Sequence, residues 1–163
     1  MSQLPKILKS KAKVRFQDCD PFNHLNNSAY LNYFMNHRED VLIENYNLNI
    51  YKKAKQEGKS WVSSSNQIAY LKPAFLSETV IIESELIDFN TSELKVEMRM
   101  FNKDKSHLKS VIWCQFVHFN LLKQKREHHA KDLMELFQSV VNTQETDTFE
   151  ERLNRLRLFT LEK

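Results

Sequence analysis

The hydrophobic periodicity of this chain changes once, from the spacing of a helix to the spacing of strands. Between residues 27 and 46, apolar side chains form two adjacent stripes at helical spacing, which predicts a helix with a wide buried face. Residues 94–101 then alternate apolar and polar side chains, and residues 111–119 are apolar at both parities, as in strands. One buried helix followed by a run of strands predicts an α+β domain, in which an antiparallel sheet packs on that helix.

The predicted strands are short and separated by polar turns. They cover residues 11–16 before the helix and residues 61–71, 79–87, 94–101 and 111–119 after it. The chain beyond residue 120 becomes charged and carries two amphipathic helical patterns, around residues 133–140 and 149–156. We therefore expect one domain over residues 1–120 and a charged helical extension over 121–163. The extension has no acid–base cluster, so we expect the chemistry not to depend on it.

A single glycine, Gly58, is present among the 163 residues. Phosphate-cradling loops of the P-loop and dinucleotide-binding types need several glycines, so both classes of nucleotide-binding protein are excluded. We expect Gly58 to end a helical turn, and turns at positive φ elsewhere to use Asn or Asp. The net charge is only +3, from 24 Lys and Arg against 21 Asp and Glu, and no basic run has interleaved aromatic residues. We therefore expect no nucleic-acid partner.

The remaining composition points to a cytoplasmic protein without a metal or another cofactor. No apolar stretch reaches the roughly 18 residues that a membrane span needs, and residues 1–13 lack the apolar core of a signal peptide. The two cysteines, Cys19 and Cys114, lie far apart and form no C-x-x-C motif, which favours a reducing compartment. The six histidines show no metal-ligand spacing.

Residues 15–34, RFQDCDPFNHLNNSAYLNYF, gather most of the chemistry-bearing side chains directly before the predicted helix. The first turn of a helix presents unpaired backbone N–H groups, which can stabilise the oxyanion formed when a thioester carbonyl is attacked. A carboxylate nearby can act as a nucleophile or activate water. Asp, Asn and Pro are also the residues of an ordinary strand-to-helix turn, so composition alone leaves a purely structural turn as the alternative.

The string DCDPFNHLNNSAYLNYF resembles the motif of hotdog-fold acyl-CoA thioesterases of the 4-hydroxybenzoyl-CoA thioesterase type. That motif reads D-x-D, a short turn that usually ends in Gly-His, then x-N-N-x-x-Y and a long helix. The later string YLKPAFLSETVII resembles the family's Tyr-x-x-Pro-Ala strand end, and the resemblance covers roughly residues 11–120. It implies a hotdog fold, with a five-stranded antiparallel sheet wrapped around a long central helix. It also implies a homodimer or homotetramer with active sites between protomers.

The same resemblance implies roles for individual residues. The second Asp of D-x-D is the catalytic one in this family, which makes Asp20 the general base or nucleophile, while Asp18 bonds the turn. His24, Asn27 and Ser28 would orient the substrate and hold the oxyanion, although a turn histidine or a helix cap can be purely structural. The family's Gly before His is Asn23 here, and Asn tolerates the positive φ that such a turn needs.

Further candidates each have a structural alternative. Ser64, Ser65 and Asn66 interrupt a predicted strand and either line a pocket of the partner subunit or form an exposed strand face. Lys72 and Arg99 are candidates for binding the phosphates of coenzyme A, or are ordinary surface charges. Cys19 as a nucleophile would lack a specified helper base.

The predicted activity is hydrolysis of an acyl-coenzyme A thioester to the free acid and CoA. The main alternative is a non-catalytic hotdog module that binds acyl-CoA or a protein partner, because fold does not fix function. A hotdog dehydratase is a third possibility, but the sequence lacks an Asp/His pair placed as those enzymes place it.

Overall fold

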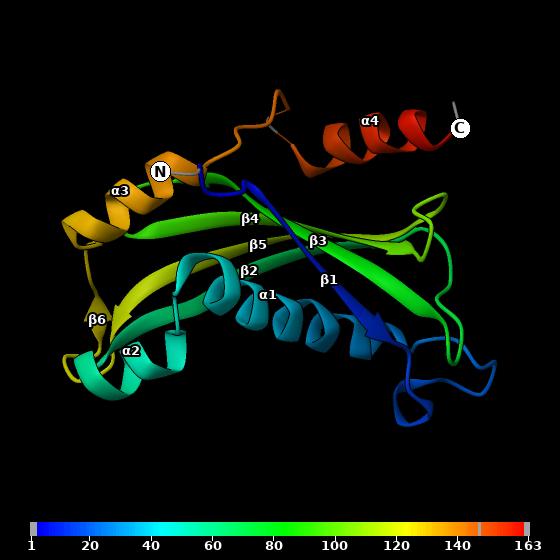
Figure 1. The fold of residues 1–163 in the computed structure, drawn as a ribbon, viewed down its shortest axis with the longest axis horizontal. Helices are drawn as coiled ribbons and strands as arrows, with labels where there is room; N and C mark the ends of the chain where they lie inside the picture. The colour runs from blue at the N-terminus through cyan, green and yellow to red at the C-terminus, as the bar shows by residue number, and fades with distance from the viewer. Residues whose placement is uncertain (1–2, 147, 162–163) are drawn as a thin grey trace.

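The computed structural model describes residues 3–146 and 148–161 and consists of one curled antiparallel sheet with helices on both sides (Figure 1). The strands run in the order β1-β3-β4-β5-β2, and the short β6 pairs only with β5. Their bounds are β1 (Ile7–Lys13), β2 (Lys59–Tyr70), β3 (Thr79–Phe89), β4 (Glu93–Asn102), β5 (Leu108–Asn120) and β6 (Lys125–Arg126). The helices are α1 (Tyr30–Tyr46), α2 (Ile50–Glu57), α3 (Lys131–Val140) and α4 (Phe149–Leu161). The predicted α+β class and the sheet around one long helix are confirmed.

The long helix α1 packs lengthwise against the inner face of the sheet (Figure 1). A 3-10 turn, Asn27–Ala29, precedes α1, and the Asn26 side chain caps this turn. The first predicted stripe is buried through Tyr30, Phe34 and Val41. The second stripe is less buried than predicted, since Leu31 is 37% exposed. The helix instead buries His37 and Arg38, which the pattern of apolar residues did not indicate.

The first strand lies earlier in the chain than predicted. The predicted strand 11–16 is β1 at Ile7–Lys13, and Phe16 begins a 3-10 turn in which its side chain is 78% exposed. The sequence hides this strand because β1 is an edge strand, paired only with β3, and its lysines alternate with small residues. The four later strands contain or closely overlap their predicted ranges.

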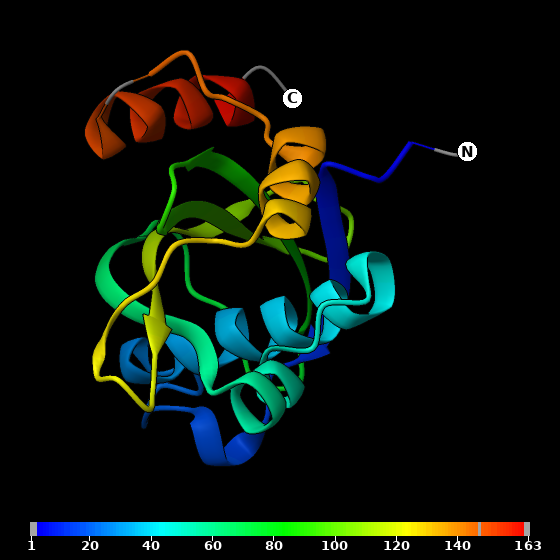
Figure 2. The same ribbon diagram turned by 90° about the vertical axis from the view of Figure 1, so that its left-hand side faces the viewer.

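Residues of the predicted extension complete the hydrophobic core. Leu133 and Phe137 of α3 belong to the main buried cluster. Before α3, His129 accepts a hydrogen bond from the Trp61 indole N–H (3.0 Å), and its Nδ1 lies 3.1 Å from the carbonyl oxygen of Asn90. The helix α4 lies on the opposite side of the sheet from α1 (Figures 1 and 2), where Phe149 packs on Trp113 with ring centroids 5.4 Å apart. Packing therefore does not stop at residue 120.

Positive φ angles follow the prediction in part. Gly58 caps α2 at φ 65°, and Asn23 and Asn47 have φ values of 59° and 53°. Ser77, Lys105 and Gln124 also have positive φ, so the expectation that only Asn or Asp would replace glycine was too narrow. In the described residues, no helix has the length and apolar character of a membrane span.

Two buried histidines should make stability fall in mild acid. Burial lowers the pKa of His37 to about 4, and burial likewise lowers the pKa of His129 to about 4. Each histidine thus takes up a proton less readily in the folded protein than in the unfolded chain. Their contribution to stability is complete above the unfolded pKa of about 6.5 and is lost as the pH falls toward 4.

Thermal unfolding at a series of pH values between 7 and 4 measures this effect. The melting temperature should decrease through that window, and His129→Asn should flatten the dependence. Substituting the neighbouring exposed His128 with Asn is the matched control and should leave the slope unchanged. A melting temperature that stays constant from pH 7 to pH 4 would contradict the prediction.

Candidate active site

The loop that precedes α1 is fixed against the segment that follows β2. Leu25 N–H donates to the Ala74 carbonyl (2.7 Å), and Leu76 N–H donates to the Asn23 carbonyl (2.8 Å). Asn23 N–H in turn donates to the Asp20 carbonyl (3.0 Å). The left-handed conformation of Asn23 lets the chain reverse here, so this turn forms although the glycine is missing.

Asp20 is half-buried, and the two oxygens of its carboxylate differ. Oδ1 accepts hydrogen bonds from the backbone N–H groups of Phe22 (2.9 Å) and His24 (3.0 Å). Oδ2 has no hydrogen-bond partner within residues 3–146 and 148–161. Asp20 lines a cavity of about 220 Å³, together with Asn27, Tyr30 and Tyr70. A carboxylate held through one oxygen and free at the other can activate water or attack a carbonyl.

Asp18 is engaged in the structure of the turn, as expected. Its Oδ2 accepts a hydrogen bond from the Tyr33 hydroxyl (2.7 Å), and its carbonyl accepts one from Asn26 N–H (2.8 Å). Burial and then the hydrogen bond to Asp18 raise the pKa of Tyr33 to about 12, so the phenol keeps its proton and remains a donor. The two aspartates therefore have different surroundings. Asp18 joins the loop to α1 through Tyr33, and Asp20 lines a cavity.

The start of the helix supplies fewer free donors than expected. Ser28 N–H donates to the Asn26 side chain (3.0 Å), so it is not free to hold an oxyanion, contrary to the prediction for Ser28. Asn27 N–H has no hydrogen-bond partner among the described residues. The Tyr70 hydroxyl donates to the Asn27 carbonyl (3.0 Å) and so fixes this peptide at the cavity wall.

Two further side chains surround Asp20. His24 lines the cavity, and its ring packs edge-on against Phe75 with centroids 5.1 Å apart. The Cys19 thiol donates to the Arg15 carbonyl (3.3 Å). Partial desolvation and then the charges of Asp18 and Asp20 raise the pKa of Cys19. A raised thiol pKa disfavours the thiolate and therefore the alternative in which Cys19 is the nucleophile.

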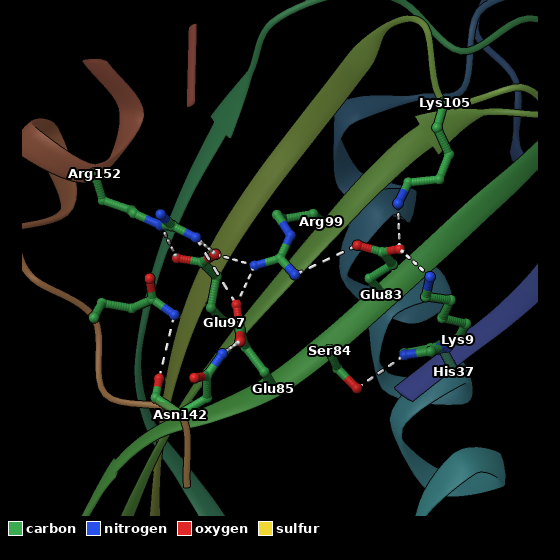
Figure 3. Close-up of polar contacts among 11 residues, drawn as sticks. Lys9, His37, Glu83, Ser84, Glu85, Glu97, Arg99, Lys105, Asn142 and Arg152 are labelled. Atoms are coloured by element: carbon green, nitrogen blue, oxygen red, sulfur yellow. Dashed lines mark hydrogen bonds and ion pairs between the residues drawn. The ribbon is translucent and has the colours of Figure 1, made fainter. Parts of the chain in front are cut away.

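The structure brings only one of the two predicted CoA-binding cations to this cavity. Lys72 lines it, with an exposed side chain whose Nζ lies 3.0 Å from His107 Nδ1. Arg99 is only 5% exposed, on the outer face of β4. Its guanidinium is paired with three carboxylates, those of Glu83, Glu85 and Glu97 (Figure 3). The guanidinium is buried and already neutralised, which disfavours the expectation that Arg99 binds a CoA phosphate.

Ser64, Ser65 and Asn66 lie away from the Asp20 cavity, in the middle of β2. All three are exposed, and a bulge between Ser63 and Ser65 shifts the register with β5. The Ser64 hydroxyl donates to the Gln115 carbonyl (3.2 Å). Since β2 pairs only with β5, the other side of this strand is an open sheet edge. Within one chain these residues form the exposed strand face that was the alternative prediction.

Tyr70 is one of the cavity residues that the site prediction omitted, and its hydroxyl contacts the predicted residue Asn27. It closes β2, packs on Tyr30 with ring centroids 5.1 Å apart, and donates to Asn27. The signal was present, because Tyr70 is the first residue of the YLKPA string that carried the second part of the resemblance. Its role could not be read from the sequence because 43 residues separate it from Asn27.

Comparison with known proteins supports the fold. The chain is similar to YbaW of Escherichia coli, at 24% identity over 83% of this chain and 99% of that one, with a TM-score of 0.70. It is similar to a DHNA-CoA thioesterase from Staphylococcus aureus, at 14% identity over 82% and 90% of the two chains, with a TM-score of 0.76. A hypothetical protein of Staphylococcus aureus solved in complex with CoA matches at 14% identity over 94% and 95%, with a TM-score of 0.78.

No curated protein matches the chain. At these identities the solved structures establish the fold alone. A family model, however, matches residues 14–146, which include the Asp20 loop, α1, the strands β2 to β6 and α3. The chain therefore belongs to the thioesterase-like superfamily.

Proposed function

We propose that this protein hydrolyses acyl thioesters of coenzyme A, with Asp20 as general base or nucleophile. The observation that carries the proposal is the Asp20 carboxylate, fixed through Oδ1 and free at Oδ2, on the wall of a cavity at the start of α1. Membership of the thioesterase-like superfamily supports the reaction class. The CoA bound to one structural relative supports the choice of thiol carrier.

In the proposed reaction, the thioester carbonyl lies between Asp20 and the backbone N–H of Asn27. Asp20 removes a proton from a water molecule as its oxygen attacks the carbonyl carbon. The negative charge that develops on the carbonyl oxygen is held by Asn27 N–H, whose peptide is fixed by Tyr70. The C–S bond then breaks, and the CoA thiolate leaves and takes up the proton. In the nucleophilic variant, an Asp20 oxygen attacks directly and water hydrolyses the resulting anhydride.

Substrate binding is proposed to use His24 and Lys72. The His24 ring lines the cavity beside Asp20 and would orient the acyl group. Lys72 lines the same cavity and is exposed, so its ammonium can approach a CoA phosphate from the solvent. Arg99 takes no part in this proposal.

A thiol-release assay across acyl-CoA substrates of increasing chain length tests the function. We expect release of free CoA that depends on acyl-CoA concentration and saturates. Tight binding of acyl-CoA without any release of thiol would instead favour the alternative, a non-catalytic binding module.

We further propose that two copies of the chain share each site. The cavity at Asp20 has about 220 Å³, whereas pockets for small organic ligands usually have roughly 300–1,000 Å³. The open edge of β2 is the natural place for a second copy to pair, because it presents unpaired backbone groups. Pairing there would bring Ser64, Ser65 and Asn66 to the partner, which is the first of the two alternatives stated for them above.

Sedimentation velocity should therefore find a dimer or a larger assembly. The chain has a mass of 19.5 kDa, so a dimer has twice that mass, about 39 kDa. Turnover per chain should fall when the protein is diluted below the dissociation constant of the assembly. A 19.5 kDa species that keeps full turnover on dilution would exclude the shared site while leaving the hydrolase proposal intact.

A further inference from the structure

Arg38 is a buried cation without an anionic partner. It lies on the buried face of α1 with 5% exposure, and its Cζ is 4.1 Å from the centroid of the Phe116 ring. Within residues 3–146 and 148–161, its guanidinium forms no ion pair and no hydrogen bond. Burial lowers the pKa of Arg38 to about 10, so the side chain is still charged at neutral pH.

Arg38 also lines a small cavity at the end of the fold away from Asp20. The cavity has about 40 Å³ and lies between α1, α3, the start of β1 and the inner face of the sheet, elements that Figure 2 shows around the same space. Most of its wall is apolar, formed by side chains such as Leu42, Leu48, Leu94, Phe137 and Val140. Lys6, an exposed residue, lies at the rim.

Each of the other polar side chains of this wall already has a partner. Lys6 donates to the Val141 carbonyl (2.9 Å), and the Tyr46 hydroxyl donates to the Pro5 carbonyl (2.6 Å). Ser84 is hydrogen-bonded to His37 (3.0 Å). The Glu85 carboxylate is held by Arg99 and by the amide of Asn142. Glu85 therefore does not neutralise Arg38, although both residues line the cavity.

An arginine that is largely buried without an anion is costly, because the ring of one phenylalanine replaces only part of its hydration. The Arg38 nitrogens keep some contact with water, since none of them is a fully buried atom without a partner. Arg38 has five N–H donors in a planar fork, and that geometry matches a carboxylate. The apolar wall beside the guanidinium is suited to an aliphatic tail and offers no further donors. A cavity of about 40 Å³ admits only a small carboxylate with a tail of a few carbon atoms and excludes a long acyl chain.

We propose that this cavity, which we call the Arg38 site, binds a short aliphatic carboxylate. The carboxylate pairs with the Arg38 guanidinium, and the tail packs against Leu42, Leu94 and Phe137. The Arg38 site and the Asp20 cavity have no lining residue in common, so the proposal does not depend on hydrolase activity. Ligand bound at the Arg38 site would join α3 to α1, because both helices contribute residues to the cavity wall.

The test is a titration of the full-length protein with butyrate at constant ionic strength. Butyrate at ten times its dissociation constant should raise the melting temperature by about 3–5 °C, whereas butan-1-ol at the same concentration should not. In the wild-type protein, the Arg38 side-chain N–H signal in an NMR spectrum should shift along the same titration curve. Sodium chloride should give neither response.

Arg38→Met is the decisive variant. It retains most of the volume and removes the charge, so the ligand-free protein should melt at the same or a higher temperature, and butyrate should have no effect. Arg126→Met, which removes an exposed arginine paired with Glu93, is the matched control and should respond to butyrate as the wild type does.

Three results would overturn the proposal. They are an unchanged melting temperature of the wild type in butyrate, a response to butyrate that persists in Arg38→Met, and an equal response to chloride. If Arg38→Met does not fold, the NMR titration of the wild type still decides the question, because a carboxylate bound elsewhere would not move the Arg38 signal. Arg38→Lys, which keeps the charge but loses the fork, should bind butyrate about tenfold more weakly.

Discussion

Asp20→Asn should lower kcat for acyl-CoA hydrolysis by about 10²-fold or more, with little change in melting temperature. The substitution is nearly isosteric, and the asparagine carbonyl oxygen can still accept the N–H groups of Phe22 and His24. It removes the negative charge and the basic oxygen that both proposed routes need, and general-base catalysis typically contributes 10²–10⁴-fold. The KM should change much less, because the cavity and the backbone donors remain.

Asp18→Asn is the internal control for this experiment. Asp18 accepts a hydrogen bond from the Tyr33 hydroxyl and does not line the Asp20 cavity, so the variant should lower the melting temperature more than it lowers kcat. Both variants are measured with the best acyl-CoA substrate from the chain-length series. Full activity of Asp20→Asn would refute the mechanism. Loss of turnover in Asp18→Asn alone would mean that the two aspartates have exchanged roles.

Arg99→Met should cause the largest loss of stability, about 3–5 kcal/mol in the free energy of unfolding. Its guanidinium lies among Glu83, Glu85 and Glu97, all buried, and Arg152 is the nearest other cation to Glu97 (Figure 3). Burial alone would raise the pKa of Glu97. The hydrogen bonds and charges of Arg152 and Arg99 outweigh burial and leave this pKa lowered. Removing Arg99 therefore leaves buried carboxylates without enough positive charge.

Urea unfolding of Arg99→Met and Arg155→Met measures the contrast. Arg155 pairs with Glu145 at the surface, with side chains 50% and 85% exposed, and exposed pairs contribute about 1 kcal/mol or less. The KM for acyl-CoA should be unchanged in Arg99→Met under conditions where it is folded. A loss of stability equal to that of Arg155→Met would show that the buried cluster is unimportant. A raised KM with normal stability would return Arg99 to the substrate site.

The sequence predicts those parts of the fold in which one face is apolar and the other polar. The alternation over residues 94–101 sets the inner face of β4, and the stripe through Tyr30 and Phe34 sets the buried face of α1. The same alternation predicts that the side chains of Glu97 and Arg99 are exposed to solvent, whereas the structure buries both. They are buried because α4 covers the outer face, and no local pattern states what a distant helix will cover.

For the site, too, the sequence predicts what adjacent residues determine and misses what contacts between distant residues determine. The resemblance identifies Asp20 and the loop around it, because those residues are adjacent in the chain. It does not reveal that the Asn26 side chain takes the N–H of Ser28, or that Tyr70 fixes Asn27. Arg38 is hidden for a different reason, since a lone arginine within an amphipathic helix normally lies at the solvent boundary. Its packing against the sheet, with the guanidinium over the Phe116 ring of β5, makes it buried.

The acidic residues on the outer face of the sheet also affect how much apolar surface the chain exposes during its synthesis. Glu97 and Trp113 receive their partners Arg152 and Phe149 from the last helix, so until α4 has been synthesised this face of the sheet is open to water. An unfinished sheet with a wholly apolar face would stick to other nascent chains. Three glutamates at the centre of that face, with the cations Lys9, Arg99 and Lys105 that pair with them, keep it polar during this interval. Once α4 has been made, its Arg152 forms an ion pair with Glu97, and this pair helps to attach the final helix to the sheet.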